Sequence, residues 1–173
     1  MDQVWQQIPT LAGVAIGALA SYLTSSANER SKWRRDRDLR RSEKQSLAYA
    51  EYGSAVKETY QWTMHFAHCR GLPAFGPDMT LEEVSAEMSR VSMIRAVKWE
   101  TVLLLGSEAT ISAARRWHES IWQMQHVASS DGLDLDEWMA AREESNDART
   151  AFYDSARADL GVSGETVRRR RRP

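Results

Sequence analysis

The sequence predicts an all-α protein, in which a single N-terminal transmembrane helix continues into a long helix and an antiparallel helical bundle. Residues 3–28 form an unbroken run of 26 residues without a charged side chain. Beyond this run the chain is rich in alanine, glutamate, arginine, serine and methionine, a composition that favours helices. Apolar residues there recur with the helical period of about 3.6 residues, and no strand-like alternation of any length is present.

Residues 1–28 are predicted to be a membrane anchor, with its span from Trp5 to Thr24. A helix needs about 20 mainly apolar residues to cross a bilayer, and Trp5 and Tyr22 stand where aromatic residues gather at the membrane interfaces. A cleaved signal peptide would start with basic residues, whereas the first seven residues carry only the charge of Asp2. The other alternative is a buried helix of a soluble protein, and the dense basic patch directly after the run argues against it.

The order of the two segments predicts the orientation of the chain. The basic cluster follows the apolar run, so the positive-inside rule predicts a short N-terminus outside the cell membrane and a cytoplasmic C-terminal domain. Within the span, small residues recur at every fourth position, at Gly13, Gly17 and Ser21. Such a stripe lets two helices approach closely and predicts self-association of the anchor, although small residues are also frequent in transmembrane helices without a specific role.

The net charge of −1 hides a segregation of charge along the chain. Residues 29–44 hold eight basic and four acidic side chains, and residues 45–167 hold ten basic and nineteen acidic ones. We expect a basic juxtamembrane helix at 29–46 and a disordered Arg-rich tail at 163–173. The predicted partner of both is the anionic inner leaflet; nucleic-acid phosphates are the alternative, and a solubilising role is a further one for the tail. The basic positions are Arg30, Lys32, Arg34, Arg35, Arg37, Arg40 and Arg41 in the first segment, and Arg168, Arg169, Arg170, Arg171 and Arg172 in the tail.

Residues 47–162 are predicted to form a cytoplasmic helical bundle. The first helix is expected to continue from the basic segment to His68, with a break near Asn28 or Gly53 left open. Residues 71–78 are rich in glycine and proline and predict a loop. Short connections between amphipathic helices indicate antiparallel neighbours.

Capping residues predict where the later helices begin and end. Thr80 with Glu83 forms a capping box that opens a second helix. Ser107 caps a third, Asp134 caps a fourth, and Gly161 ends it. The residues predicted to face the core are Ala48, Tyr52, Ala55, Val56, Thr59, Trp62, Thr63 and Phe66, then Leu81, Val84, Met88, Val91, Trp99, Val102 and Leu105, then Ile111, Ala114, Trp117, Ile121 and Met124, and finally Trp138, Met139, Ala148, Phe152 and Ser155.

One cluster of side chains contains residue types that bind metal ions. His65, His68 and Cys69 fall on neighbouring positions of a helix, but a metal ion would need a further ligand from His118 or His126. Capping and packing are the plainer interpretation, because histidines near a helix C-terminus are favoured without a metal. No phosphate loop or nucleophile motif occurs, so the sequence predicts no cofactor and no enzymatic activity.

The layout resembles small single-pass membrane proteins of high-GC actinobacteria, which are mostly uncharacterised. The resemblance rests on the Gly/Ala-rich span, the Arg-rich stretch, the helix start LAYAEY at 47–52, the segment VLLLGS at 102–107 and the helix end FYDSARADLG at 152–161. Some proteins of this layout are carried on conjugative plasmids and are associated with plasmid transfer or spread. The resemblance therefore implies an accessory role in DNA transfer at the membrane.

Two functions follow as expectations. The first is a membrane-anchored, non-enzymatic interaction or scaffold protein, which binds other proteins or itself through the transmembrane stripe. The alternative is an accessory of conjugative plasmid transfer that touches DNA through its Arg segments.

Overall fold

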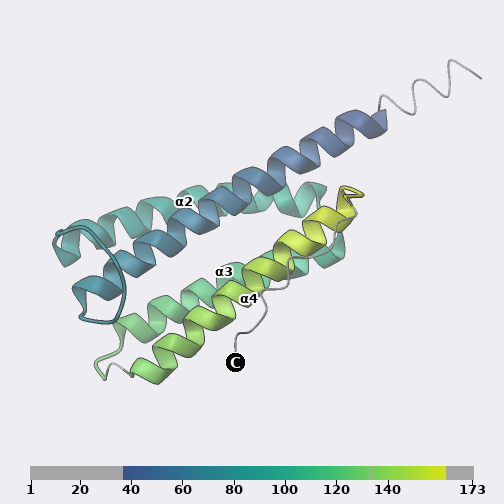
Figure 1. Cartoon of the computed structure of the whole chain (residues 1–173). Coiled ribbons are helices and arrows are strands. Elements are labelled where there is room, and N and C mark those ends of the chain that lie inside the picture. Colours follow the sequence, from purple (N-terminus) through teal and green to yellow (C-terminus); the bar gives the residue numbers. More distant parts are fainter. Residues whose placement is uncertain (1–36, 133, 163–173) are drawn as a thin grey trace, which may run out of the picture. The chain divides into compact units, whose positions relative to one another are not determined.

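The computed structural model of the chain describes residues 37–132 and 134–162. Every regular element in these ranges is a helix (Figure 1), so the predicted all-α class is confirmed for this part of the chain. The predicted anchor at 1–28, the basic segment up to residue 36 and the tail at 163–173 lie outside the described residues. No helix in the described ranges combines the length and the apolar character that crossing a bilayer requires.

The chain divides between residues 43 and 44 into two compact units. In the first, residues 37–43 are helical and all but one of their side chains are exposed. The second is a helical bundle, built from a helix at 44–69, α2 (Leu81–Leu105), α3 (Glu108–Ser129) and α4 (Leu135–Asp159). Residues 37–69 are helical without a break, so Gly53 does not interrupt the first helix.

The predicted helix ends are confirmed by the hydrogen bonds at the caps. Thr80 accepts a bond from the N–H of Glu83 and its own N–H donates to the Glu83 carboxylate, which completes the capping box. Ser107 and Asp134 accept bonds from N–H groups in the first turns of α3 and α4. After α4 the chain turns at Gly161, whose φ of +65° is unfavourable for residues with a side chain.

The hydrogen bonds between helices set the order of the bundle. The start of helix 44–69 lies beside the end of α2, where Gln45 donates to the carbonyl oxygen of Leu105 at 2.6 Å. Further along, Arg90 of α2 donates to Glu58 at 3.1 Å. The residue numbers rise on one helix as they fall on the other, so these two helices are antiparallel (Figure 1).

Helix 44–69 also contacts both remaining helices. Its Tyr49 donates to Asp159 at the end of α4, at 2.6 Å. Its Tyr52 donates to the carbonyl oxygen of Ala114 in α3, at 2.7 Å. Helix 44–69 therefore contacts each of the other three helices of the bundle.

The core consists of two clusters of buried side chains. In the first, Tyr52 contacts Phe152 and Trp117 with ring centroids 5.4 and 6.3 Å apart. The second includes Met64 and Trp138, both completely buried. The members of the first cluster are Tyr49, Tyr52, Val56, Val102, Ala113, Ala114, Trp117, Ile121, Ala148, Phe152 and Ala156. The members of the second are Met64, Ala67, Leu72, Met124, Val127, Ala128, Trp138 and Ala141.

Two residues predicted to face the core are exposed, and those predictions are wrong. Leu81 is 41% exposed because the covered face of α2 begins one turn later, at Val84. Met139 is 47% exposed because the buried residues of α4 follow a stripe that starts at Trp138, and the next position along a helix points about 100° away. A further group of predicted core residues is only partly buried: Trp62, Phe66, Met88, Trp99, Leu105, Ile111 and Ser155.

Candidate functional site

The histidines tested as metal ligands lie at the end of helix 44–69. The His65 ring stands edge-on to the rings of Trp62, at 5.0 Å, and Phe75, at 6.0 Å. Burial, and then the neighbouring His68, lower the pKa of His65. His68 itself is exposed. The loop after the helix therefore covers His65 with aromatic carbon rather than with ligand atoms.

The remaining members of the tested cluster lie apart from it or bond elsewhere. The Cys69 thiol donates a weak bond to the carbonyl oxygen of Met79, at 3.5 Å. His118 is buried in another part of the bundle, where its Nδ1 lies 3.0 Å from the Tyr52 hydroxyl. In the described ranges, no three His, Cys, Asp or Glu side chains are arranged to hold a metal ion.

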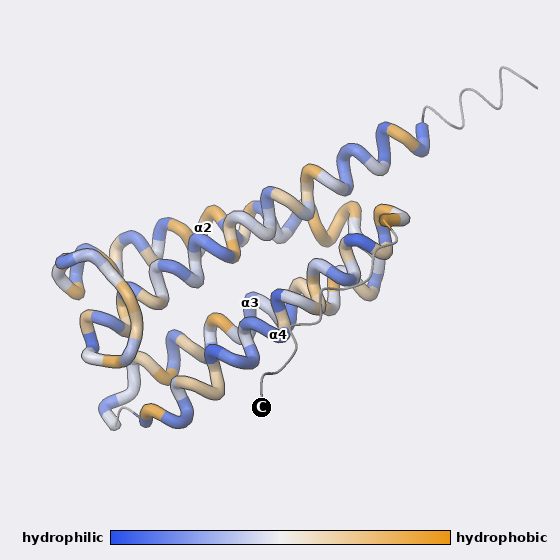
Figure 2. Tube along the Cα trace, in the orientation of Figure 1, coloured by the Kyte–Doolittle hydropathy of each residue, from blue (hydrophilic) through white to orange (hydrophobic). Residues whose placement is uncertain are grey.

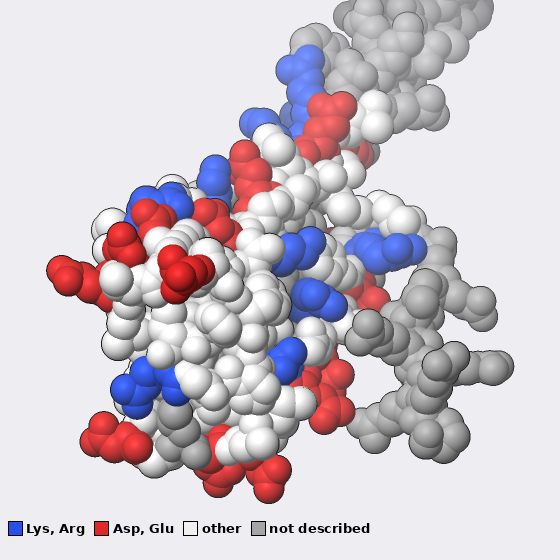
Figure 3. Space-filling view, turned by 60° about the vertical axis from the view of Figure 1, so that its left-hand side comes forward, with Lys and Arg blue, Asp and Glu red and all other residues white. Residues whose placement is uncertain are grey.

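Only part of the basic set can be placed. Arg37, Arg40 and Arg41 are exposed on the helix, and they form no ion pair with another described residue. The rest of the predicted set lies outside the described residues: Trp5, Gly13, Gly17, Ser21, Tyr22, Arg30, Lys32, Arg34, Arg35 and Arg168–Arg172. Residues 44–162 hold eighteen acidic and eleven basic side chains, and the face drawn in Figure 3 carries both signs.

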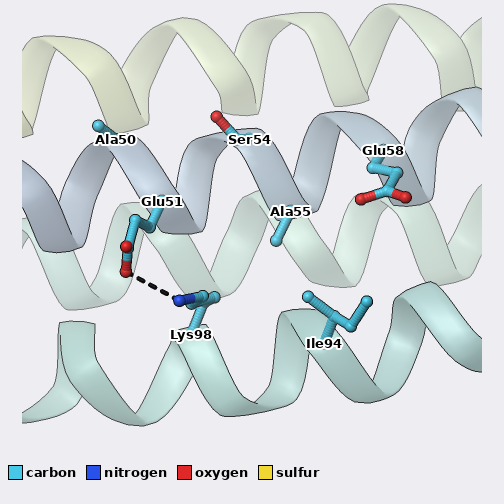
Figure 4. Close-up of a pocket in the computed structure, with 7 residues that line it drawn as sticks. All are labelled: Ala50, Glu51, Ser54, Ala55, Glu58, Ile94 and Lys98. Atoms are coloured by element: carbon cyan, nitrogen blue, oxygen red, sulfur yellow. Dashed lines mark hydrogen bonds and ion pairs between the residues drawn. The ribbon is translucent and has the colours of Figure 1, made fainter.

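A shallow groove of about 360 Å³ lies between helix 44–69 and α2 (Figure 4). Lys98 bridges it by donating to Glu51 at 2.9 Å. Ser54 supplies the only hydroxyl of the lining, points away from Lys98 and makes no hydrogen bond to Glu51 or Glu58. The groove therefore combines the Lys98–Glu51 ion pair and the Glu58 carboxylate with the apolar side chains of Ala50, Ala55 and Ile94.

The outer face of α2, defined by Met93, Val97 and Leu104, carries three strongly exposed apolar side chains. These side chains are 67%, 67% and 82% exposed. At 3.6 residues per turn they fall within about 40° of one another around the helix. The opposite face of α2 is also largely apolar, so hydrophobic residues recur along much of this helix (Figure 2). The residues of α2 that the bundle buries are Val84, Val91, Arg95 and Val102.

An arginine and two tryptophans fill the space between α2 and α3. Arg95 is only 7% exposed, and its guanidinium lies 5.1 Å from the centre of the half-exposed Trp122 ring. Its Nε has no hydrogen-bond partner, and burial lowers the pKa of Arg95. Trp99 of α2 packs against His118 of α3 at 4.9 Å. The attraction between a cation and an aromatic face compensates in part for the burial of the charge.

Sequence reasoning missed the outer face of α2 because it assigned a single apolar face to each helix. A signal was available. The residues Ala86, Arg90, Met93, Val97, Glu100 and Leu104 are spaced alternately by four and three. This spacing is typical of a helix that packs against another helix.

Comparison of the chain with models of protein families, with curated proteins and with solved structures finds no match.

Proposed function

We propose that this chain is a membrane-anchored, non-enzymatic interaction protein, whose cytoplasmic helical bundle presents α2 to a protein partner. In this proposal Trp5–Thr24 holds the chain in the cell membrane with the N-terminus outside. The basic segment that follows lies against the anionic headgroups. The bundle then acts as a rigid support for α2.

The observation that carries the proposal is the outer face of α2. Single exposed apolar residues are ordinary on soluble proteins, but Met93, Val97 and Leu104 are aligned on one face. Burial of apolar surface contributes about 25 cal/mol per Å². A partner that covers these side chains is therefore stabilised by the burial of apolar surface that stays exposed in the isolated bundle. Exposed apolar patches also commonly mark interaction sites.

The chemistry of the described surface also favours binding over catalysis. The groove beside Lys98 lacks a nucleophile with a hydrogen-bonded base, which is the arrangement that covalent catalysis requires. The buried His118 is held neutral at physiological pH by burial, which lowers its pKa to about 4, and is enclosed by aromatic rings. A histidine in this setting stabilises the fold and does not reach a substrate.

The experiment uses the full chain in membranes and the double variant Val97→Glu/Leu104→Glu. Both side chains are exposed, so the variant is expected to fold and to unfold at nearly the same temperature as the wild type. We expect it to lose the partner proteins that co-purify with the wild-type chain after mild detergent extraction. Two exposed charges on α4 provide the matched control, Asp147→Arg/Arg149→Glu, which should retain them. Equal recovery of partners by both variants would reject the proposal.

A second function, accessory to DNA transfer at the membrane, is favoured by Arg37, Arg40 and Arg41, which are exposed and form no ion pair with another described residue. Exposed guanidinium groups on one short helical segment can neutralise phosphates, and such binding weakens steeply with salt. The full chain in detergent should then bind duplex DNA at low salt. The triple variant with glutamine at these positions should reduce the slope of affinity against salt. Unchanged DNA binding after removal of these arginines and of the tail would exclude this function.

A further inference from the structure

The exposed side of α2 forms a seam of six residues, here called the α2 seam: Ala86, Arg90, Met93, Val97, Glu100 and Leu104. All six are exposed, and Arg90 and Glu100 are the only charged members. Alternate steps of four and three residues keep a seam on one side of a helix, where it can interdigitate with a second helix. The bundle leaves this seam exposed, because the buried residues of α2 lie on its opposite side and only Arg90 at the edge of the seam reaches another helix, in its ion pair with Glu58.

The order of residues along the seam is self-complementary. Consider a second α2 that runs in the opposite direction, with the twofold axis beside position 95. Met93 then faces the partner's Val97, and Ala86 faces the partner's Leu104. Arg90 faces the partner's Glu100. Because the contact is symmetric, each of these three pairs occurs twice.

The charges discriminate between the two possible directions. In a parallel pair Arg90 would face the partner's Arg90, and Glu100 would face the partner's Glu100. Like charges at such positions repel, whereas the antiparallel arrangement brings opposite charges together. Charge complementarity therefore favours a second copy of this chain in the antiparallel direction.

The existing ion pairs leave the required charges available. Arg90 donates to Glu87 at 2.6 Å and to Glu58 at 3.1 Å, but its side chain remains 48% exposed. Glu100 forms no ion pair with any other described residue. A guanidinium has five N–H donors, so Arg90 can serve an additional carboxylate. In the pair of copies, Glu100 then forms its ion pair with the partner's Arg90.

We propose that α2 pairs with α2 of a second copy in this antiparallel register. The inference rests on the proposed interaction function and names the partner. Met93 and Val97 form the apolar centre of the contact, and the Arg90–Glu100 pairs on either side of it select the direction. This contact between α2 helices is a different interface from the predicted pairing of the anchors through Gly13, Gly17 and Ser21.

Cross-linking of the full chain in non-ionic detergent tests the register. Cys69→Ser supplies a cysteine-free background, and Met93→Cys and Val97→Cys are introduced into separate chains, one of them tagged. A short bismaleimide should join position 93 of one chain to position 97 of the other in preference to either like pair. A predominant link between two copies of position 97 would overturn the antiparallel register, and no link at either position would overturn self-pairing altogether.

Charge exchange tests the selectivity in the same assay. Glu100→Arg places arginine against arginine twice in each dimer, and should lower the cross-linked fraction by roughly tenfold. Exchange of both charges, Arg90→Glu/Glu100→Arg, restores opposite charges and should restore the cross-link. Asp147→Arg on α4 is the matched control and should leave it unchanged. Failure of the double exchange to exceed Glu100→Arg alone, with both variants unfolding at similar temperatures, would contradict the assigned pair.

Failure of this inference can be told apart from failure of the proposed function. A chain that does not cross-link to itself but still loses other partner proteins on Val97→Glu/Leu104→Glu overturns self-pairing and leaves the interaction function standing. Protection of position 97 only when anionic lipid vesicles are added would instead identify a lipid surface as the occupant, and would overturn self-pairing as well.

Discussion

The hydroxyl of Tyr52 lies 3.0 Å from Nδ1 of His118, deep between helix 44–69 and α3. The same hydroxyl donates its single proton to the carbonyl oxygen of Ala114, at 2.7 Å. A carbonyl oxygen can only accept, so Nδ1 of His118 must carry the proton that bonds to the tyrosine oxygen. The bond therefore requires a proton on Nδ1 of His118, and burial, which lowers the pKa of this histidine, keeps the ring neutral. The stability of the fold is thereby linked to the charge of His118.

Protonation of His118 is expected to destabilise the bundle. Burial, and then the charges of Arg95 and Arg115, lower the pKa of His118 to about 4 in the folded chain, whereas an unfolded histidine titrates near 6.5. Above about pH 6.5 both states are neutral and the residue adds no pH dependence. Between about 6.5 and 4 the unfolded state binds a proton that the folded state does not, so stability falls as pH falls.

The comparison of wild type with His118→Phe isolates this effect from the titration of other groups. The phenylalanine keeps an aromatic ring between Trp99 and Trp122 but cannot bind a proton. Urea unfolding of both chains at pH 7 and pH 4.5 should show a larger loss of stability for the wild type. A difference between the two chains that is the same at both pH values would refute the linkage.

A close approach of two helices is predicted to reverse the usual effect of a glycine substitution. A Cβ at position 53 would lie 2.6 Å from the hydroxyl oxygen of Tyr153. Alanine is favoured over glycine in a helix by about 1 kcal/mol, yet Gly53→Ala should destabilise the chain because the tyrosine must move. In a Tyr153→Phe background the obstructing oxygen is absent, and Gly53→Ala should become neutral or stabilising. Thermal unfolding of the four chains checks this, and equal effects of Gly53→Ala in both backgrounds would contradict it.

Asp159 is predicted to tie the end of α4 to two other helices. Its carboxylate accepts bonds from Tyr49 at 2.6 Å, Thr110 at 2.8 Å and the N–H of Ser107 at 3.2 Å. Burial raises its pKa, but these bonds outweigh burial and the net pKa is lowered. The stabilisation is therefore present at neutral pH and is lost as pH falls through the folded pKa. Asp159→Asn should cost about 1–2 kcal/mol at pH 7 by urea unfolding. Asp154→Asn, on the exposed side of the same helix, should change stability little, and an equal loss there would argue against the tie.

Arg95 is predicted to be nearly dispensable for stability despite its burial. Its charge is buried without an ion pair to any described carboxylate, and its Nε has no hydrogen-bond partner among the described residues. Replacement of a poorly compensated buried charge by an apolar residue of similar length is often neutral or stabilising. Arg95→Met should therefore change the free energy of unfolding by less than about 1 kcal/mol, with some loss from the contact to Trp122. A loss above about 3 kcal/mol would indicate a partner for Arg95 that the described residues do not reveal.

Local signals predicted the helices well because the signal and its partner are close in sequence. Thr80 with Glu83, and the caps Ser107 and Asp134, satisfy N–H groups within three residues of themselves. Helix ends of this kind depend little on the rest of the molecule. The all-α class followed from the same local information.

The covered face of α2 was predicted largely correctly, since Val84, Val91 and Val102 are buried, but the second apolar face of this helix was missed. Sequence spacing places Met93, Val97 and Leu104 together on one side of the helix, but does not show whether another helix of the bundle covers that side. The arrangement of the helices decides this, and it arises from contacts between residues far apart in the sequence, such as Tyr49 with Asp159. For the same reason the sequence could not decide whether His118 lies near His65 and His68 as a further metal ligand. Only the folded chain shows that His118 pairs with Tyr52.

The rate at which a cysteine at position 97 reacts with a maleimide, in the full chain and in its native membrane, tests the central claim most directly. In the isolated chain Val97 is 67% exposed, and Asp147 on α4 is exposed as well. If α2 is an interaction surface, Val97→Cys should react several-fold more slowly than Asp147→Cys in the membrane. After detergent extraction and dilution the two rates should become similar. Equal rates in the membrane would show that nothing covers this face, and would contradict the account.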